Sequence, residues 1–455
     1  METLLGSSHT GDFWVTDNPA LKFVGSLEID EHGSATLSIE GDYRDLIALD
    51  AQPRFDMQGN AEGKEFSLFW CFASRVPLFH MDRKAKIAIN IVAIGALIDS
   101  IEAKFASALS FTTPEIIRWT GLRGIALKGP RTAKKALQVT YRGRRTKPVQ
   151  VDGATFQVST EITYSANSVA EVNLIERHGV RVVFSEPQSV LAADKWITKA
   201  CRLFSLALRC SIVCRVHSLE RGTGSAVTVI TPWSASNTVE TKMTHPLFTR
   251  PKKREIYEKV LRSWFAQYDK LEPVISLRIA LLSHPQRYRE FEFLTYVQAL
   301  EALHRRTHPS RTLVTRKRFA ALHRKFADAI PDRWKAKPDL VAKLEYLNEI
   351  TLGERLRNLF AGNRELLSKL FNDEVRDIAL IKNLRNYLTH YEGKRRAKKL
   401  RDYTGTAKFQ HLTSKVLLLL EIAMLRTIGF SAIEVRRLIE NDPTYRDLCR
   451  MDHSH

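Results

Sequence analysis

The residues best suited to chemistry lie in one short stretch near the end of the chain: Arg385, Asn386 and His390. On a helix, which turns about 100° per residue, Asn386 and His390 share a face and Arg385 stands about 140° from His390, bordering that face. RNA carries its own nucleophile, the 2′-hydroxyl, so its cleavage needs one group that accepts a proton and another that stabilises the charged phosphorane. Histidine ordinarily titrates near neutral pH, and arginine presents a permanently charged fork to phosphate oxygens. Asn386, one turn before His390, is expected either to orient the imidazole or to bind a phosphate oxygen. The stretch therefore predicts ribonuclease chemistry without a metal ion.

The spacing alone carries little information. An arginine followed by a histidine after four to six residues is expected by chance roughly once or twice in a chain of this length, and Arg278 with His284 and Arg318 with His323 fit it too. Requiring asparagine directly after the arginine lowers the chance expectation to roughly a few per cent, and Arg385-Asn386 then stands alone. The alternative for His390 is a residue that interacts with the dipole and carbonyls at a helix C-terminus.

Two further features adjoin the motif. A basic run follows it at once, in which we expect substrate phosphates to be held by Lys394, Arg395, Arg396, Lys398, Lys399 and Arg401. The alternative for this run is a charged, exposed helix end. Glu301 continues the apolar row of Leu294 and Val297 on an earlier helix, and an inward carboxylate needs a partner. Arg385 is the candidate partner, which Glu301 would orient; the alternative is a surface glutamate bordering the core.

A single histidine is an incomplete site, because the leaving oxygen also needs a proton. A two-fold dimer would bring a second His390 and a second Arg385 to one cleft, and the sequence therefore predicts a homodimer. Signatures of nucleotide hydrolysis, hydride transfer, zinc proteolysis and lipase-type chemistry are absent from the chain. We expect neither a cofactor nor a metal ion.

The charge supports a polyanionic partner. Residues 1–250 hold 29 basic and 25 acidic side chains, whereas residues 251–455 hold 41 and 25, so the C-terminal part carries +16 of the net charge of +20. Nucleic acid is the first partner that such a field favours, and an anionic membrane surface is the second. The N-terminus lacks the features of a secretory signal, and the most apolar stretch, Ile87–Ile101, is too short to span a bilayer. We expect a cytoplasmic protein that does not enter the membrane.

The hydrophobic pattern predicts an α+β chain of two domains. Residues 1–250 alternate with period two, as in the hairpin of Leu27 and Leu37, which is typical of a β-sandwich or barrel-like domain; one helix is embedded near residues 190–209. A second hairpin is expected about Arg177-His178-Gly179. Residues 251–455 follow a helical period throughout and predict an all-α bundle, with separate helices at Glu255–Asp269 and Pro273–Leu282.

The motif and its surroundings resemble a known family. The helical region resembles the HEPN superfamily, whose ribonucleases carry an Arg-x4-6-His motif, matched by Arg385, Asn386 and His390. The segments Tyr296–Arg306 and Leu384–His390 are similar to ApeA-type anti-phage proteins, as are the N-terminal stretches Gly11–Trp14, Gly25–Leu27 and Trp119–Gly121.

This resemblance implies an abortive-infection ribonuclease, dimeric through its HEPN domain, with the β-rich domain sensing a phage-derived trigger or restraining the nuclease. A transfer RNA loop is one candidate substrate. The products expected are a 2′,3′-cyclic phosphate and a 5′-hydroxyl. The alternative is a non-catalytic HEPN regulator that binds RNA or protein through the basic helical face.

Overall fold

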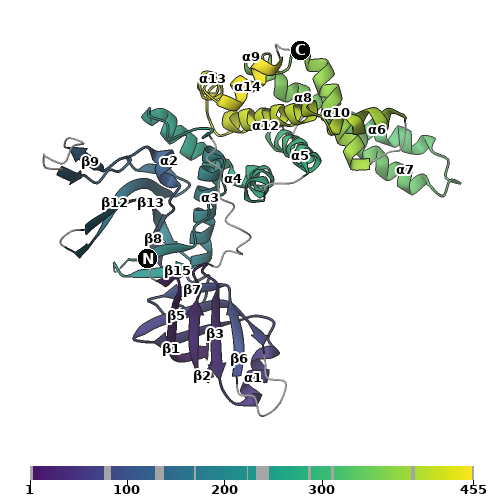
Figure 1. Ribbon diagram of the computed structural model, residues 1–455. Helices are drawn as coiled ribbons and strands as arrows, with labels where there is room; N and C mark the ends of the chain where they lie inside the picture. The colour runs from purple at the N-terminus through teal and green to yellow at the C-terminus, as the bar shows by residue number, and fades with distance from the viewer. Residues whose placement is uncertain are drawn as a thin grey trace. The chain divides into compact units, whose positions relative to one another are not determined.

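The structure is a computed structural model that describes residues 4–75, 84–128, 138–168, 171–222, 224–231, 245–284, 288–308, 312–390 and 395–452. It divides into two compact units, Met1–Ala266 and Gln267–His455. The first unit is built mainly of strands and the second is helical (Figure 1). The expected order of a β-rich domain followed by an all-α bundle is confirmed.

The division falls within one long helix, α4 (Arg254–Ser283), rather than near residue 250. The first turns of α4 pack on the N-terminal unit, where the indole N–H of Trp264 donates to the carbonyl of Lys199 over 2.9 Å. Two separate helices were expected here, and that prediction is wrong because Pro273 lies inside α4. A proline removes one backbone hydrogen bond, which weakens a helix without always ending it.

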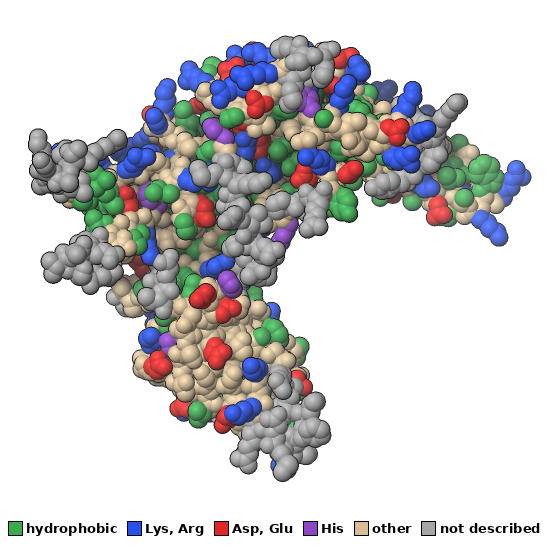
Figure 2. Space-filling model, in the orientation of Figure 1, with side chains coloured by type: hydrophobic (Ala, Val, Ile, Leu, Met, Phe, Trp, Pro, Cys, Tyr) green, Lys and Arg blue, Asp and Glu red, His purple; other side chains and the backbone are tan. Residues whose placement is uncertain are grey.

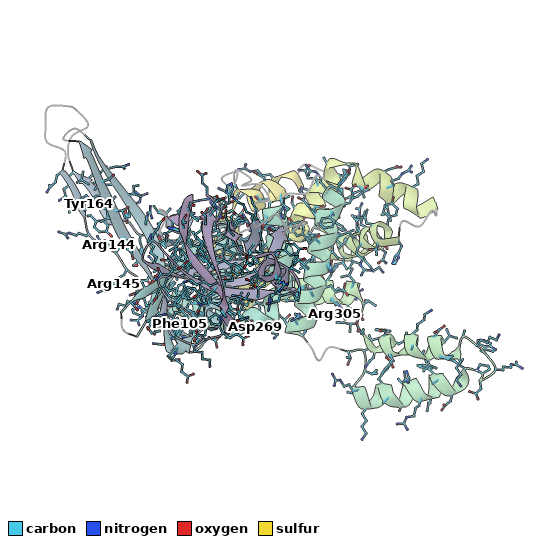
Figure 3. The ribbon with its side chains drawn as sticks, turned by 90° about the horizontal axis from the view of Figure 1, so that it is seen from below. Phe105, Arg144, Arg145, Tyr164, Asp269 and Arg305 are labelled. Atoms are coloured by element: carbon cyan, nitrogen blue, oxygen red, sulfur yellow. The ribbon has the colours of Figure 1, made fainter. Side chains whose placement is uncertain are left out.

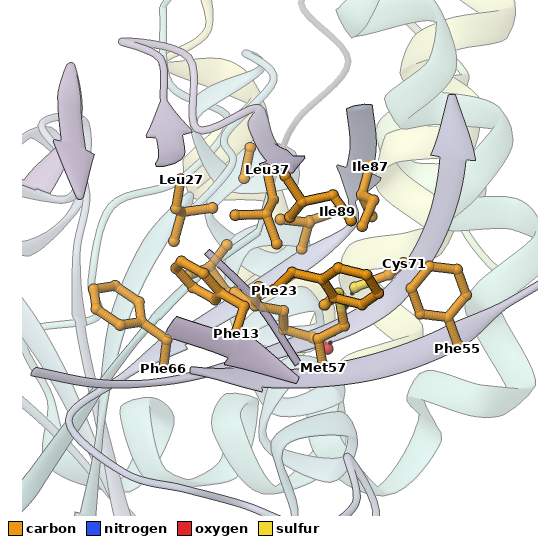
Figure 4. Packing of buried hydrophobic residues seen from close by; sticks show 14 of the residues in the cluster. Phe13, Phe23, Leu27, Leu37, Phe55, Met57, Phe66, Cys71, Ile87 and Ile89 are labelled. Carbon is orange, nitrogen blue, oxygen red and sulfur yellow. Dashed lines mark hydrogen bonds between the residues drawn. The ribbon is translucent and has the colours of Figure 1, made fainter. Parts of the chain in front are cut away.

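Six strands of the N-terminal unit close into a barrel: β1 (Ser7–Val15), β2 (Asn18–Ile29), β3 (Ala35–Glu40), β4 (Phe55–Ala61), β5 (Lys64–Arg75) and β6 (Lys84–Ile89). Antiparallel pairs run in the order β5, β4, β1, β2, β3, β6, and β6 pairs back to β5. Leu27 stands opposite Leu37 in the β2–β3 pair, so the predicted hairpin is confirmed. Their side chains fill the interior with Phe13, Phe23 and Phe66 (Figure 4).

The barrel closes because β5 changes partner along its length. Its first half pairs with β7 (Ile91–Ile94), and its last residues, from Phe72 on, pair with β6. Between these halves Trp70 has a φ of 57°, a left-handed conformation that is uncommon for a large side chain. The Trp70 N–H donates to the Asp56 carboxylate over 2.8 Å, which holds the bend.

The rest of this unit extends the same sheet beyond β7. Its elements are β8 (Ala106–Thr112), α2 (Ile116–Thr120), β11 (Val149–Val151), β12 (Ala154–Ser168), β13 (Glu171–Gln188), α3 (Val190–Leu208), β14 (Val216–Arg221) and β15 (Ala226–Ile230). The expected hairpin about Gly179 is wrong, because β13 is continuous and Gly179 pairs with Ser159 on one side and Thr112 on the other. The β12–β13 ribbon carries the exposed Tyr164, with Arg144 and Arg145 beside it (Figure 3). The remaining elements are α1 (Tyr43–Asp50), β9 (Ile125–Lys128) and β10 (Gln138–Tyr141).

The helical unit contains the second half of α4 followed by α5 (Arg289–Thr307), α6 (Arg316–Ala329), α7 (Lys337–Leu344), the 3-10 turn Glu345–Asn348, α8 (Leu352–Ala361), α9 (Arg364–Leu367), α10 (Glu374–His390), α11 (Arg395–Thr404), α12 (Ala407–Thr427), α13 (Ala432–Glu440) and α14 (Pro443–Asp452). Helix α12 is mostly buried, and the centroid of its Phe409 ring lies 5.3 Å from that of Phe293 on α5. Arg278 of α4 pairs with the fully buried Glu421 of α12 over 3.1 Å. Arg278 thus belongs to the core, although its spacing to His284 resembles the motif.

Helix α8 begins with a capping box. The Thr351 hydroxyl accepts from the N–H of Glu354 over 3.3 Å, and the Glu354 carboxylate accepts from the N–H of Thr351 over 2.7 Å. We expect Thr351→Ala to lower the free energy of unfolding of the helical unit by about 1 kcal/mol, as measured by urea denaturation. Thr351→Ser retains the acceptor and should stay close to the parent protein. Equal midpoints for the alanine and serine variants would contradict this role of the cap.

Candidate active site

Helix α10 positions the motif. Its buried stripe, Ile378, Ile381, Leu384 and Leu388, follows helical spacing and packs the helix into the bundle against α5 and α8. The N–H of Arg376 donates to the Asp373 carboxylate at the start of the helix. The opposite face leaves Asn386 and His390 exposed, and the helix ends at His390. The predicted site residues therefore stand at an accessible helix terminus.

The motif side chains are only partly tied to one another. Nη1 of Arg385 donates to Oδ1 of Asn386 over 3.3 Å, whereas the described part of the chain gives His390 no hydrogen-bond partner. Asn386 therefore contacts the arginine rather than the imidazole. The exposed imidazole of His390 is accessible to a substrate, whereas the guanidinium of Arg385 is held by its hydrogen bond to Asn386.

Glu301 of α5 lies against Arg385, with Oε2 at 3.8 Å from Nη2. The same carboxylate accepts from Nη2 of Arg305 over 3.2 Å and lies 4.0 Å from Nε of Arg355. It is 21% exposed, so it borders the core instead of lying inside it. Figure 3 marks Arg305 on this helix. Three guanidinium groups thus converge on Glu301, and the charges here favour binding of an anion.

Glu349, which follows the 3-10 turn, joins the cluster. Its Oε2 lies 2.7 Å from Nη2 of Arg305 and 3.3 Å from Nη2 of Arg355. Burial, and then the neighbouring charge of Arg305, lower the pKa of Arg355. For Arg305, burial acts in the same direction but is outweighed by the hydrogen bonds and charges of Glu301 and Glu349, so its pKa is raised. Both guanidinium groups keep their charge at any physiological pH.

A buried histidine supports Arg355 from behind. His304 is fully buried, with Nδ1 at 3.5 Å from Nη1 of Arg355 and Nε2 at 3.3 Å from the amide of Asn358. Because a guanidinium can only donate, Nδ1 is the acceptor in the first contact. The ring also stacks on His308 at 4.5 Å between centroids. His304 is thus part of the framework and lies behind the charged cluster.

The basic run falls on α11 and the residues before it. Lys398, Lys399 and Arg401 are exposed on the helix. Nε of Arg401 lies 4.0 Å from Oδ1 of Asp402. Lys394 lies outside the described residues, as do the side chains of Arg395 and Arg396. Figure 2 shows many further Lys and Arg side chains over the helical unit. The described part of the run is therefore accessible to a polyanion.

Sequence reasoning missed Arg305, Arg355 and Glu349 as members of this cluster. Arg305 follows Glu301 by four residues, a spacing that brings helical side chains together and that could have identified it. Arg355 and Glu349 lie about fifty residues further on, and only the packing of α8 against α5 joins them to Glu301. Among the described residues no group of three or more His, Cys, Asp or Glu side chains could hold a metal ion.

Comparison with known proteins identifies both parts of the chain. The family model described as ApeA N-terminal domain 1 matches residues 8–264, and the model described as Apea-like HEPN matches residues 294–434, which include Glu301 and the motif. No curated protein and no solved structure matches the chain significantly. The two matches support a function of the HEPN nuclease type in anti-phage defence. None of the helices in the described ranges has the length and apolar character needed to cross a bilayer.

Proposed function

Since the chain belongs to the ApeA family, with a C-terminal HEPN domain, we propose that it is a metal-independent RNA endonuclease of abortive-infection defence. The observation that carries the proposal is the placement of Arg385 and the exposed His390 at one helix end, with the Arg385 guanidinium 3.8 Å from Glu301. A positive group and a proton carrier are the two parts that cleavage by the 2′-hydroxyl requires.

In the proposed reaction the 2′-oxygen attacks phosphorus and the bond from phosphorus to the 5′-oxygen breaks. His390 takes the proton from the 2′-hydroxyl, and the 5′-oxygen receives a proton as it leaves. Arg385 stabilises the charge that develops on the phosphorane oxygens. Asn386, which accepts from Arg385 over 3.3 Å, orients the guanidinium. The products are a 2′,3′-cyclic phosphate and a 5′-hydroxyl, and DNA is not cut.

The second proton transfer is the reason for proposing a homodimer. One His390 cannot hold and lack the proton at the same moment, so a second copy on a two-fold axis would protonate the leaving oxygen. Lys398, Lys399 and Arg401, exposed on α11, would hold phosphates on either side of the scissile bond. The same holds in this proposal for Lys394, Arg395 and Arg396.

Incubation of the purified full chain with total cellular RNA in excess EDTA tests the function. We expect discrete fragments that end in cyclic phosphate and begin with a 5′-hydroxyl, while a DNA oligonucleotide of matching sequence stays intact. If RNA is bound but remains uncut, both alone and after expression during phage infection, the regulator that binds RNA through its basic face is the better description.

Glu301 is proposed as a positioning residue for Arg385. We expect Glu301→Gln to lower kcat for RNA cleavage roughly 10- to 100-fold, because the neutral amide holds the guanidinium less firmly and small misplacements are costly. KM and the unfolding midpoint should change little, since Glu301 only borders the core. Glu301→Asp keeps the charge and should recover part of the rate. Full activity of the glutamine variant would make Glu301 a surface residue without this role.

A further inference from the structure

A cavity of about 460 Å³ lies beside the catalytic helix end, where the first turns of α5 meet the last turns of α10 and α11. It is lined by Tyr288, Glu290, Phe291, Leu294, Tyr387, Leu388, Arg401 and Thr404. This volume falls in the range typical of small-molecule sites. Neither the motif nor the arginine cluster accounts for these residues.

The cavity has aromatic walls over an apolar floor. Tyr288 is 75% exposed and Phe291 is 52% exposed, whereas Leu388 is buried. Large aromatic side chains left open to water beside an apolar floor are typical of a binding surface. Planar, partly apolar groups such as nucleobases stack on such rings.

The cavity is also close to the proposed chemistry. Tyr387 precedes His390 by three residues on α10, and residues at this spacing are neighbours on a helix surface. Arg401, which also lines the cavity, brings a permanent positive charge from the basic helix α11. A nucleotide held here would therefore have its phosphate within reach of both Arg401 and the motif.

The negative charge of Glu290 indicates which part of a nucleotide, the base or the phosphate, would lie beside it. Glu290 lines the cavity, and its negative charge disfavours a phosphate there, since like charges repel. A carboxylate instead accepts hydrogen bonds from a base edge that carries donors. The Watson–Crick edge of guanine offers two adjacent donors, N1–H and the 2-amino group. Uracil offers one donor between two carbonyl oxygens, which the carboxylate repels.

From these contacts we propose that the cavity is a base-binding site that receives an unpaired guanine next to the scissile phosphate. Phe291, Tyr288 and Tyr387 supply the stacking surface, Glu290 reads the donor edge and Arg401 holds the adjoining phosphate. The inference deepens the proposed nuclease function, on which it rests, by naming the nucleotide that the enzyme prefers.

Fluorescence anisotropy with short labelled deoxyoligonucleotides tests the site without cleavage, since DNA lacks the 2′-hydroxyl. The full chain should bind d(TTGTT) about tenfold more tightly than d(TTTTT). Phe291→Ser should remove most of this preference, and Glu290→Gln should weaken guanine binding selectively. Phe326→Ser is the matched control, because Phe326 is a similarly exposed aromatic residue on α6, outside the cavity; it should leave binding unchanged.

Equal affinity of the parent protein for both oligonucleotides, or an undiminished guanine preference in Phe291→Ser, would overturn the proposal. Sedimentation of the same variants tests the other candidate for the group that fills the cavity, which is a second copy of the chain. If Phe291→Ser converts a dimer to monomers and leaves the guanine preference intact, the second copy covers the cavity. These outcomes do not depend on RNA cleavage. A chain that prefers guanine but never cuts RNA would contradict the nuclease proposal and not the base site.

Discussion

Replacing His390 with alanine should lower the rate of RNA cleavage about 10²- to 10⁴-fold, the range that general acid–base groups contribute. The side chain is exposed at the end of α10 and has no hydrogen-bond partner within the described residues, so its loss should disturb neither the bundle nor Arg385. RNA affinity should stay nearly unchanged, because phosphate binding is assigned to the arginine and lysine side chains. Single-turnover cleavage of a labelled RNA, with filter binding of the same RNA, measures both quantities.

The control for this prediction is His323→Ala on α6. His323 follows Arg318 at the spacing of the motif, but it packs its ring against Phe319 and no asparagine follows its arginine. We expect wild-type cleavage from this variant. A cleavage rate that is equal in the parent protein and in His390→Ala would remove His390 from the site, whatever the rate of the control.

The sequence predicts the architecture well where the spacing of apolar residues keeps one period over a whole element. Period-two alternation in residues 27–39 identifies both strands of the β2–β3 hairpin, because one face of each is buried in the barrel. The period does not distinguish a strand that continues from one that turns, so the hairpin predicted about Gly179 is wrong and β13 passes through this residue. The strand β5, which closes the barrel, changes partner around the left-handed Trp70, and no residue preference predicts that conformation.

The same contrast applies to the site. Arg385, Asn386 and His390 lie on one helix, so helical geometry alone places them together. Arg305 could be found in the same way, because it follows Glu301 by four residues on one helix. Arg355 and Glu349 depend on how α8 packs against α5, which a single sequence does not specify. A motif that lies on one element can be found from the sequence, whereas the charges that surround it follow from tertiary packing.

Replacing Arg385 with alanine should lower kcat about 10²- to 10³-fold, comparable to the loss of one preorganised donor in an oxyanion site. The effect should fall on kcat more than on KM, because the charge that Arg385 stabilises develops only in the transition state. Arg385→Lys keeps the positive charge but loses the planar fork. We expect it to recover only part of the rate.

The contrast with α11 makes this test specific. Lys398→Ala removes an exposed charge from the same basic surface and should raise KM, with kcat almost unchanged. It should also reduce the slope of log affinity against log salt by about 0.7, the value for one phosphate contact on a single strand. If Arg385→Ala and Lys398→Ala alter kcat and KM in the same way, Arg385 is only one more contact to the RNA backbone. If only Arg385→Ala lowers kcat, Arg385 acts on the reacting phosphate and the lysine acts on its neighbours.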